Sequence, residues 1–160
     1  MAVQYMAALT ERYDQLGYTP YRWFHADGPP SLSRLTKRLA DAHVGVLSTS
    51  GAYRVGQIGF SYKDDTSIRA IPKDTATEQI HFAHFTENYL VDARKDPNCL
   101  VPVKALRAIE AEGAIGELAP ELLTCMGGIY SQRRVHEELA PALEARFRAQ
   151  AVDAVLLIPM

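Results

Sequence analysis

Four short clusters contain the residues of this sequence whose types and spacing could do chemistry. They are Ser48–Gly51, Asp64–Pro72, His81–His84 and Cys125–Gly128. Hydroxyl, carboxylate, guanidinium, imidazole and thiol groups are the usual agents of anion binding, proton transfer and nucleophilic attack. We expect each cluster at a strand end or a turn, which is where open α/β sheets place their binding sites.

The first two clusters are candidates for anion binding. Backbone N–H groups of Ser48–Gly51 could bind an anion, although a plain turn is the favoured interpretation. In the second cluster, strand alternation places Ser67 and Arg69 on one face. Arg69 could hold a substrate carboxylate in a fork, or it could pair with Asp64 or Asp65 inside the protein. The spacing leaves both alternatives open.

The third cluster provides a candidate for proton transfer. His81 and His84 are three residues apart, so on a strand they face opposite ways and do not form a two-histidine metal clip. His84, at the end of the strand pattern, is the better candidate for a general acid or base. A structural histidine with satisfied hydrogen bonds is the equal alternative. We expect no metal site, because no spacing typical of metal ligands appears.

The fourth cluster ends in a glycine pair. Gly127 and Gly128 indicate a tight turn or a close approach of backbone to a ligand. Cys125 could be reactive if the helix that follows lowered its thiol pKa. A buried, inert thiol is the more common case.

Alternating helices and strands must position these clusters. The pattern predicts helices over 31–42, 102–111 and 130–150, with strands at 43–51, 79–85 and 153–160 and a strand-like stretch at 56–72. Pro141 should kink or split the third helix. This order predicts an α/β fold with three layers, a mostly parallel sheet flanked by helices. The apolar run at 153–160 predicts a buried parallel strand.

The predicted organisation is an N-terminal extension, residues 1–30, followed by an α/β domain, residues 31–160. The extension has a helical pattern around Gln4–Gln15 and then an aromatic, proline-bearing segment. The aromatic side chains of that segment are expected to serve packing or an interface. They are Tyr18, Tyr21, Trp23 and Phe24.

Composition excludes several classes of function. The chain has 160 residues, with 17 basic and 19 acidic side chains and a net charge of −2. This balance does not favour binding to nucleic acid or to a membrane. No apolar run is long enough to cross a bilayer, and the N-terminus lacks the pattern of a secretory signal. Two cysteines do not make a disulfide framework, so a cytoplasmic location with reduced thiols is expected.

Six stretches together resemble one family. They read DDTSIRAIP, FAHF, KDPNCLVPVKAL, EAEGAIGELAP, TCMGG and VDAVLLIPM. In this order and spacing they resemble the selenoprotein B subunits of glycine, sarcosine and betaine reductases, and the related selenoprotein subunit of D-proline reductase. The resemblance runs from about His43 to the C-terminus, which makes residues 31–160 a reductase-like domain.

The resemblance implies reductive cleavage of the α-carbon–nitrogen bond of a small amino-acid-like substrate. In the family, a selenocysteine, or a cysteine in its place, attacks the carbon and displaces an amine, and reducing thiols regenerate it. The glycine-type enzymes work with a partner subunit whose pyruvoyl group holds the substrate amine as a Schiff base. Selenocysteine and a partner pyruvoyl group are therefore the cofactors expected of the complete enzyme, and none is expected in this chain.

The sequence departs from the family at its end. The family nucleophile follows the stretch that matches VDAVLLIPM, and here that stretch ends at Met160. A selenocysteine codon read as a stop is the favoured explanation. A separate polypeptide that carries the remainder is another, and loss of catalysis with retention of a binding or assembly role is the third. A domain truncated at this strand would expose apolar surface, so we expect a homo-oligomer.

These considerations predict a pocket for a small carboxylate, in which His84 handles protons and Arg69 orients the substrate. A non-catalytic binding or assembly subunit is the alternative, and a thiol redox site at Cys125 is the least favoured. The predicted substrate-binding residues are Ser48, Thr49, Ser50, Asp65, Ser67, Arg69, Asn98, Cys99, Met126, Gly127 and Gly128.

Overall fold

The computed structural model describes residues 4–19 and 24–160. Contacts within the chain divide it into two compact units, residues 1–32 and residues 33–160. Each unit is described by itself below.

The first unit contains helix α1 (Tyr5–Gln15), which confirms the helix expected there. Beyond its end, the ring of Tyr18 packs edge-on against Tyr13, with ring centroids 5.9 Å apart. Tyr21 and Trp23 lie outside the described residues, so their expected packing role stays a prediction.

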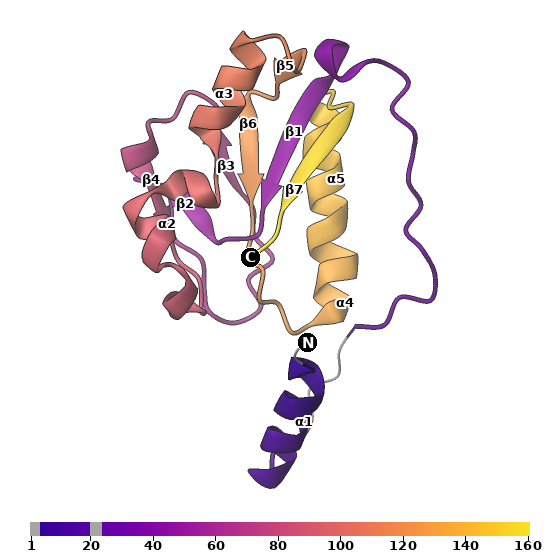
Figure 1. Cartoon of the computed structure of the whole chain (residues 1–160), viewed down its shortest axis with the longest axis vertical. Helices are drawn as coiled ribbons and strands as arrows, with labels where there is room; N and C mark the ends of the chain where they lie inside the picture. Colours follow the sequence, from indigo (N-terminus) through magenta and orange to yellow (C-terminus); the bar gives the residue numbers. More distant parts are fainter. Residues whose placement is uncertain (1–3, 20–23) are drawn as a thin grey trace. The chain divides into compact units, whose positions relative to one another are not determined.

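The second unit alternates strands and helices around a mixed sheet, which confirms the α/β fold (Figure 1). Its strands are β1 (His43–Ser48), β2 (Ala52–Arg54), β3 (Arg69–Pro72), β4 (Ile80–Phe82), β5 (Glu117–Leu118), β6 (Glu121–Thr124) and β7 (Ala154–Ile158). Its helices are α2 (Val91–Lys95), α3 (Val103–Ala111), α4 (Gln132–Arg134), the π-helix η5 (Val135–Leu139) and α5 (Ala140–Ala149). Short 3-10 turns are η1 (Leu39–Asp41), η2 (Thr77–Gln79), η3 (Glu87–Tyr89) and η4 (Pro97–Cys99). Within the part of the chain that the structure describes, no helix is both long and apolar enough to cross a membrane.

Strand β1 lies at the centre of the main sheet. It pairs in parallel with β7 along one edge and with β5 and β6 along the other. Strand β3 adds to β6 in the antiparallel direction, with Arg69 opposite Thr124. Strands β2 and β4 form a separate antiparallel pair. The carboxyl ends of β1, β6 and β7 therefore lie at the same edge of the sheet, together with the amino end of β3.

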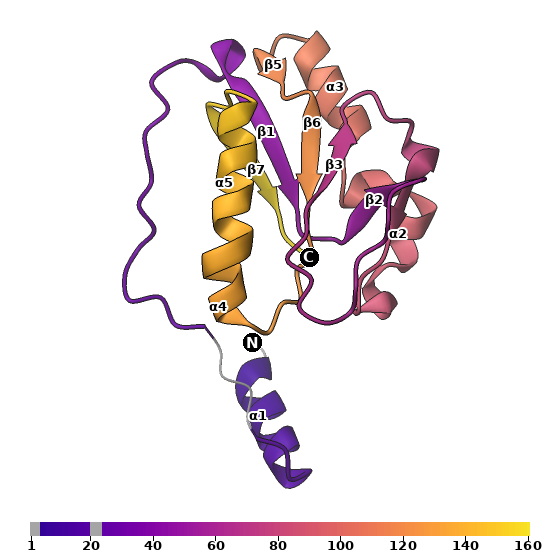
Figure 2. The same cartoon turned by 180° about the vertical axis from the view of Figure 1, so that it is seen from behind.

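Helices cover both faces of this sheet, as Figures 1 and 2 show from opposite sides. On one face, Val103 and Leu106 of α3 are buried in a core that includes Val46 and Leu122. On the other face lies α5, and a Cβ at Gly45 would come within 2.8 Å of the Phe147 ring. The absence of a side chain at that point of β1 lets α5 approach the sheet closely.

The expectation of a buried C-terminal strand is wrong in one respect. Strand β7 is parallel to β1, as predicted, but its apolar side chains are not buried. Val155, Leu156 and Leu157 are 38%, 41% and 65% exposed. The strand is at an edge of the sheet, with β1 as its partner on one side only among the described residues. A continuous apolar run is typical of a central strand with a neighbour on each side. Strand β7 pairs only with β1 among the described residues, so its side chains are less covered.

The helix expected over 31–42 is also wrong. Residues 31–38 have no regular helix, and only the short turn η1 (Leu39–Asp41) forms. Leu32, Leu35 and Leu39 are 85%, 40% and 51% exposed. Because most of the stability of a short helix comes from packing its apolar face, this helical pattern alone is insufficient. Of the strand-like stretch 56–72, only Arg69–Pro72 pairs as a strand.

The long C-terminal helix runs continuously through α4, η5 and α5, so the effect expected of Pro141 takes only the form of an irregular π-turn just before it. Ser131 caps its start, since its hydroxyl accepts a hydrogen bond from the amide of Arg134. The π-helix η5 then separates α4 from α5, and Pro141 lies at the start of α5. Proline has no N–H to donate to the preceding turn, so a widened turn just before it is a natural accommodation.

Candidate functional site

The turns that follow β1 and β6, together with the chain after β7, meet at the carboxyl edge of the sheet. The amide of Thr49 donates to the carbonyl of Ile158 at 3.1 Å, and its hydroxyl accepts from the amide of Met160 at 2.9 Å. The amide of Gly51 donates to the carbonyl of Cys125 at 3.0 Å. Three of the four predicted clusters therefore contribute to one region, which we call the strand-end site: Ser48–Gly51, His84 with Phe85, Cys125–Gly128 and Met160.

Buried hydroxyl groups form the floor of the strand-end site. The hydroxyls of Ser48 and Ser50 lie 2.8 Å apart, and Ser48 also donates to the carbonyl of Leu100 at 2.8 Å. The hydroxyl of Thr124 donates to the carbonyl of Ala52 at 2.5 Å. Ser48 thus ties the sheet to the loop at Leu100 and Thr124 ties it to strand β2, and their hydroxyl protons are already used inside the protein.

The glycine pair forms a turn packed against other parts of the chain. A Cβ at Gly127 would lie 2.8 Å from the carbonyl oxygens of both Met160 and Thr49. A Cβ at Gly128 would lie only 1.5 Å from the ring of Phe85. The sequence left two alternatives open for the glycine pair, a tight turn or a close approach to a ligand. The contacts of Gly127 and Gly128 are with other parts of this chain, which corresponds to the tight turn. Met126 is buried beside them and forms a β-bridge with Ser50.

His84 is buried beside the turn after β1, and it is 2% exposed. The backbone amide of Thr86 donates to its Nδ1 atom at 3.2 Å, and the Thr86 hydroxyl lies 2.6 Å from the same nitrogen. The other ring nitrogen, Nε2, is buried and has no hydrogen-bond partner among the described residues. His81, in contrast, is exposed.

The contact with Thr86 determines the protonation of His84. A backbone N–H can only donate, so Nδ1 must present a lone pair. The neutral ring then carries its proton on Nε2, and the Thr86 hydroxyl also donates to Nδ1. Burial lowers the pKa of the His84 imidazole, and the nearby Glu87 carboxylate opposes this effect. Both the hydrogen bonds and the burial therefore favour a neutral ring with an Nε2–H group.

Phe85 covers His84 at this site. The two rings stack with centroids 5.1 Å apart and planes at 22°. The ring of Tyr130 also packs against Phe85, with centroids 6.2 Å apart and planes tilted by 51°. The Phe85 side chain is 37% exposed, so it separates the buried imidazole from the solvent. Sequence reasoning missed Phe85 and Thr86, although a side chain that bonds the backbone two residues later is a known local pattern.

Arg69 binds the loop that precedes its strand. Its guanidinium donates to the carbonyls of Ile58 at 2.7 Å and Gly59 at 3.2 Å, and to the hydroxyl of Ser67 at 2.7 Å. It also lies over the ring of Phe60, with 4.3 Å from Cζ to the centroid. No ion pair joins it to Asp64 or Asp65 among the described residues. In this structure the guanidinium holds the loop to β3.

Asp65 and Ser67 shape the same loop. The Asp65 carboxylate accepts hydrogen bonds from the amide of Ser61 at 2.7 Å, the amide of Ser67 at 2.9 Å and the hydroxyl of Ser67. Burial by itself would raise the pKa of Asp65, but these hydrogen bonds outweigh it and hold the pKa below its ordinary value. Ser67 links this carboxylate to Arg69, so the predicted residues of the second cluster bind one another.

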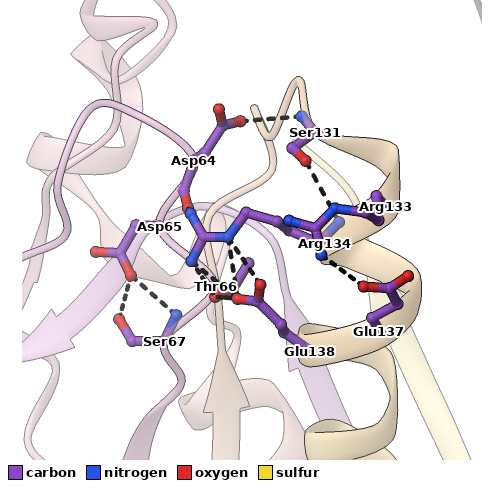
Figure 3. A network of polar contacts seen from close by, with 9 residues as sticks. All are labelled: Asp64, Asp65, Thr66, Ser67, Ser131, Arg133, Arg134, Glu137 and Glu138. Atoms are coloured by element: carbon purple, nitrogen blue, oxygen red, sulfur yellow. Dashed lines mark hydrogen bonds and ion pairs between the residues drawn. The ribbon is translucent and has the colours of Figure 1, made fainter.

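A polar network fastens the loop to the start of α4 (Figure 3). The Asp64 carboxylate accepts from the amides of Tyr130 at 2.7 Å and Ser131 at 3.0 Å. Arg134 donates to the carbonyl of Asp64 at 2.5 Å and forms an ion pair with Glu138. Asp64 itself has a φ of 47°, in the left-handed region that few residues other than glycine adopt. The loop 64–67 therefore has a structural anchor in helix α4 and η5.

Asn98 and Cys99 belong to the turn η4. The Asn98 amide side chain donates to Asp96 at 2.8 Å and accepts from the backbone amide of Lys104 at 3.1 Å. Asn98 also lines an open groove of about 1050 Å³ between η2, β4, α2 and α3, and none of the other predicted substrate-binding residues lines it. Among the described residues, the hydrogen bonds of the Asn98 side chain go to Asp96 and Lys104 and not to the strand-end site.

The two thiols are not activated. Burial raises the pKa of the Cys125 thiol to about 11. Burial and the neighbouring Asp96 carboxylate raise the pKa of Cys99. Both cysteines are free. Among the residues that the structure describes, no group of three or more His, Cys, Asp or Glu side chains is arranged to hold a metal ion.

Comparisons with known proteins agree on one family. The sequence model of the glycine/sarcosine/betaine reductase selenoprotein B family matches residues 64–159. The chain is 33% identical over 129 residues to D-proline reductase subunit gamma of Acetoanaerobium sticklandii. That match covers 81% of this chain and 53% of the relative, so the chain spans about half of the relative's length. No solved structure matches the chain.

Proposed function

This chain belongs to the glycine/sarcosine/betaine reductase selenoprotein B family, and we propose that it supplies the substrate pocket of a selenol- or thiol-dependent reductase subunit. The proposed reaction is reductive cleavage of the α-carbon–nitrogen bond of glycine, sarcosine, betaine or D-proline. The name of the relative, D-proline reductase subunit gamma, supports a subunit of this reductase type. The match covers only 53% of that relative, so the reductase activity is proposed for this chain and does not follow from the match itself.

The observation that carries the proposal is the position of Met160. Its amide donates to the Thr49 hydroxyl at 2.9 Å, and its carbonyl packs against Gly127. A selenocysteine or cysteine placed directly after residue 160 would emerge at the strand-end site, beside the turn that packs on Phe85. The carboxyl edge of a parallel sheet is where α/β proteins commonly hold their ligands.

The chemistry proposed for that nucleophile is a displacement. A selenolate attacks the α-carbon and forms a C–Se bond while the C–N bond breaks, and the amine leaves with the bonding electrons and takes up a proton. A thiol would then attack the selenium and form an Se–S bond, while the carbon leaves with the C–Se bonding electrons and takes up a proton. A second thiol would reduce the Se–S bond, which forms a disulfide and regenerates the selenolate. For glycine, a pyruvoyl group on a partner subunit would activate the substrate amine as a Schiff base, whereas the quaternary ammonium of betaine cannot form one and is already a positively charged leaving group. Cys99 and Cys125 do not suit the nucleophile's role, because their raised pKa values leave both thiols protonated at neutral pH.

Partner subunits are part of the proposal, since the relative is itself named as a subunit. The exposed apolar side chains of β7, Val155, Leu156 and Leu157, support association of the chain with a second copy. Sedimentation velocity should show a concentration-dependent boundary, and a single monomer boundary at all concentrations would count against the homo-oligomer. We also propose a cytoplasmic location, because selenol chemistry and the exposed thiol of Cys99 require a reducing compartment.

The test of the substrate class is calorimetry on the chain with glycine, sarcosine, betaine and D-proline. We expect heat of binding from at least one of them, and L-proline provides the matched control for D-proline. The absence of heat from all four at millimolar concentration would contradict a small-carboxylate pocket. The catalytic part is tested by adding a dithiol to protein that carries a selenocysteine or cysteine directly after residue 160, which should release ammonia or amine from at least one of these compounds.

A non-catalytic binding or assembly subunit is the second candidate. The observation that favours it is the protonated state of both thiols, because the described chain then offers no ionised nucleophile at neutral pH. This candidate predicts substrate binding by calorimetry without reductive cleavage when the complete protein is supplied with a dithiol. Release of ammonia or amine from any of the four compounds by the complete protein would contradict it.

A further inference from the structure

The Nε2 atom of His84 is a buried polar group without a partner. Buried polar groups in folded proteins nearly always form hydrogen bonds, so an unpaired one calls for an explanation. The rest of the imidazole is held firmly, because Nδ1 accepts from Thr86 and the ring stacks on Phe85. The unpaired nitrogen lies in the strand-end site, where a Cβ at Gly51 would come within 3.4 Å of the His84 Cβ.

We propose that His84 recognises the substrate as a neutral hydrogen-bond donor, with its Nε2–H group donating to a carboxylate oxygen. This proposal rests on the proposed function, from which it takes the substrate class, and it changes the role expected of His84 from proton transfer to recognition. A neutral ring with its proton on Nε2 has its remaining lone pair on Nδ1. That lone pair already accepts from the amide and hydroxyl of Thr86.

The same geometry argues against a general base. To accept a proton from a substrate at Nε2, the ring would first have to give up the proton it carries there. Moving that proton to Nδ1 would place it against the Thr86 amide, whose own N–H points at the same nitrogen. Protonation of both ring nitrogens would break the hydrogen bond from the Thr86 amide to Nδ1 in the same way. The donor role requires neither change.

Access to His84 depends on Phe85. The Phe85 ring covers the imidazole, packs over the backbone of Gly128 and is itself 37% exposed. Rotation of this one side chain toward solvent would uncover the imidazole without moving the sheet. The Nε2–H bond points outward in the plane of the imidazole, so a bound carboxylate would accept it at the edge of the ring, beside the stacked position of Phe85 and not over the imidazole face.

The His84→Asn variant separates recognition from structure. An asparagine Oδ1 atom can accept the Thr86 amide in place of Nδ1, since a side-chain oxygen that bonds the amide two residues later is a common turn. The variant has no group at the position of Nε2. It should therefore keep the local fold, with a melting temperature close to that of the wild type, while losing the proposed donor. His81→Asn is the matched control, because His81 is an exposed histidine of the same segment.

The experiment combines calorimetry with ¹⁵N-histidine spectra, with glycine, betaine and D-proline as probes. We expect the Nε2–H tautomer for free His84 at neutral pH, a shift of its Nε2 resonance on saturation, and binding about tenfold to a hundredfold weaker in His84→Asn. His81→Asn should bind as the wild type does.

Four results would overturn the proposal. One is an Nδ1–H tautomer or an imidazolium at neutral pH, and another is unchanged affinity in a folded His84→Asn variant. Binding by the wild type with no shift at His84 would overturn the donor role while leaving the proposed function intact. No binding of any probe by the wild type would instead contradict the proposed small-carboxylate pocket, and the recognition role with it.

Discussion

Replacement of Gly128 by alanine tests how the turn after β6 packs against Phe85. The new Cβ would lie 1.5, 2.4 and 2.6 Å from three atoms of the Phe85 ring, and these are its nearest neighbours. Gly128 is not among the glycines with a positive φ, so alanine fits the backbone there. The clash is therefore with one side chain, and Phe85 has to leave its position over His84.

The expected cost follows from what Phe85 loses. Its stacking on His84 contributes about 0.5–1.5 kcal/mol, and its partial burial contributes about 1 kcal/mol. Alanine returns about 0.4–1 kcal/mol by restricting the unfolded chain. The free energy of unfolding should fall by about 0.5–2 kcal/mol, which corresponds to a melting temperature lower by roughly 1–8 °C for a chain of this size.

Urea denaturation followed by circular dichroism measures this change, with Gly59→Ala as the control. A Cβ at Gly59 meets its nearest neighbour, Ala83, at an ordinary 3.4 Å, so that variant should be close to neutral. The decisive comparison is Gly128→Ala in a Phe85→Ala background. Because all three nearest neighbours belong to Phe85, the cost should nearly vanish there. The same cost in both backgrounds would refute the reasoning.

Three further predictions concern the loop anchor, His84 and the thiols. Asp64→Ala removes the acceptor for two amides at the start of α4 and should lower the free energy of unfolding by about 1–3 kcal/mol, measured by urea denaturation, whereas Asp64→Asn should retain part of it. Because the pKa of His84 is lowered in the native state, the unfolded chain binds the extra proton, so stability should fall as the pH is lowered through the ordinary histidine pKa of about 6.5. His84→Asn should flatten that part of the profile, and an unchanged slope would contradict the assignment. With a pKa of about 11, Cys125 should react with iodoacetamide far more slowly than exposed Cys99, as peptide mass spectrometry can determine; equal rates would show that the turn after β6 opens readily.

The sequence predicted correctly those helices and strands whose apolar residues find a surface to pack against. Helix α3 forms within the predicted range 102–111, and an irregular π-turn precedes Pro141, where a kink or split of the last helix was expected. The helix over 31–42 failed because periodic leucines do not show whether a surface exists to bury them. The predicted burial of strand β7 failed for a similar reason. An apolar run does not show how many neighbouring strands and helices will cover it.

The candidate site was predictable in outline only. The turns after β1 and β6 could be placed at one sheet edge, because parallel strands end together. The partners of Arg69 could not be predicted, since they are backbone carbonyls of Ile58 and Gly59 in a loop without a regular pattern. The bond from Thr86 to His84 is local and was within reach of the sequence, whereas the burial of His84 depends on Phe85 and on the turn at Gly51.

The π-helix Val135–Leu139 has a consequence for the length of this segment. A π-turn contains one residue more than the α-turn it replaces, so it changes the rotational phase of everything that follows by about 100°. Before it, the helix is fixed by the Asp64 anchor; after it, Phe147 packs on Gly45. Deletion of a single residue from the π-turn would restore an ordinary helix but rotate Phe147 away from the sheet. The extra residue thus acts as a spacer that reconciles two separately anchored ends.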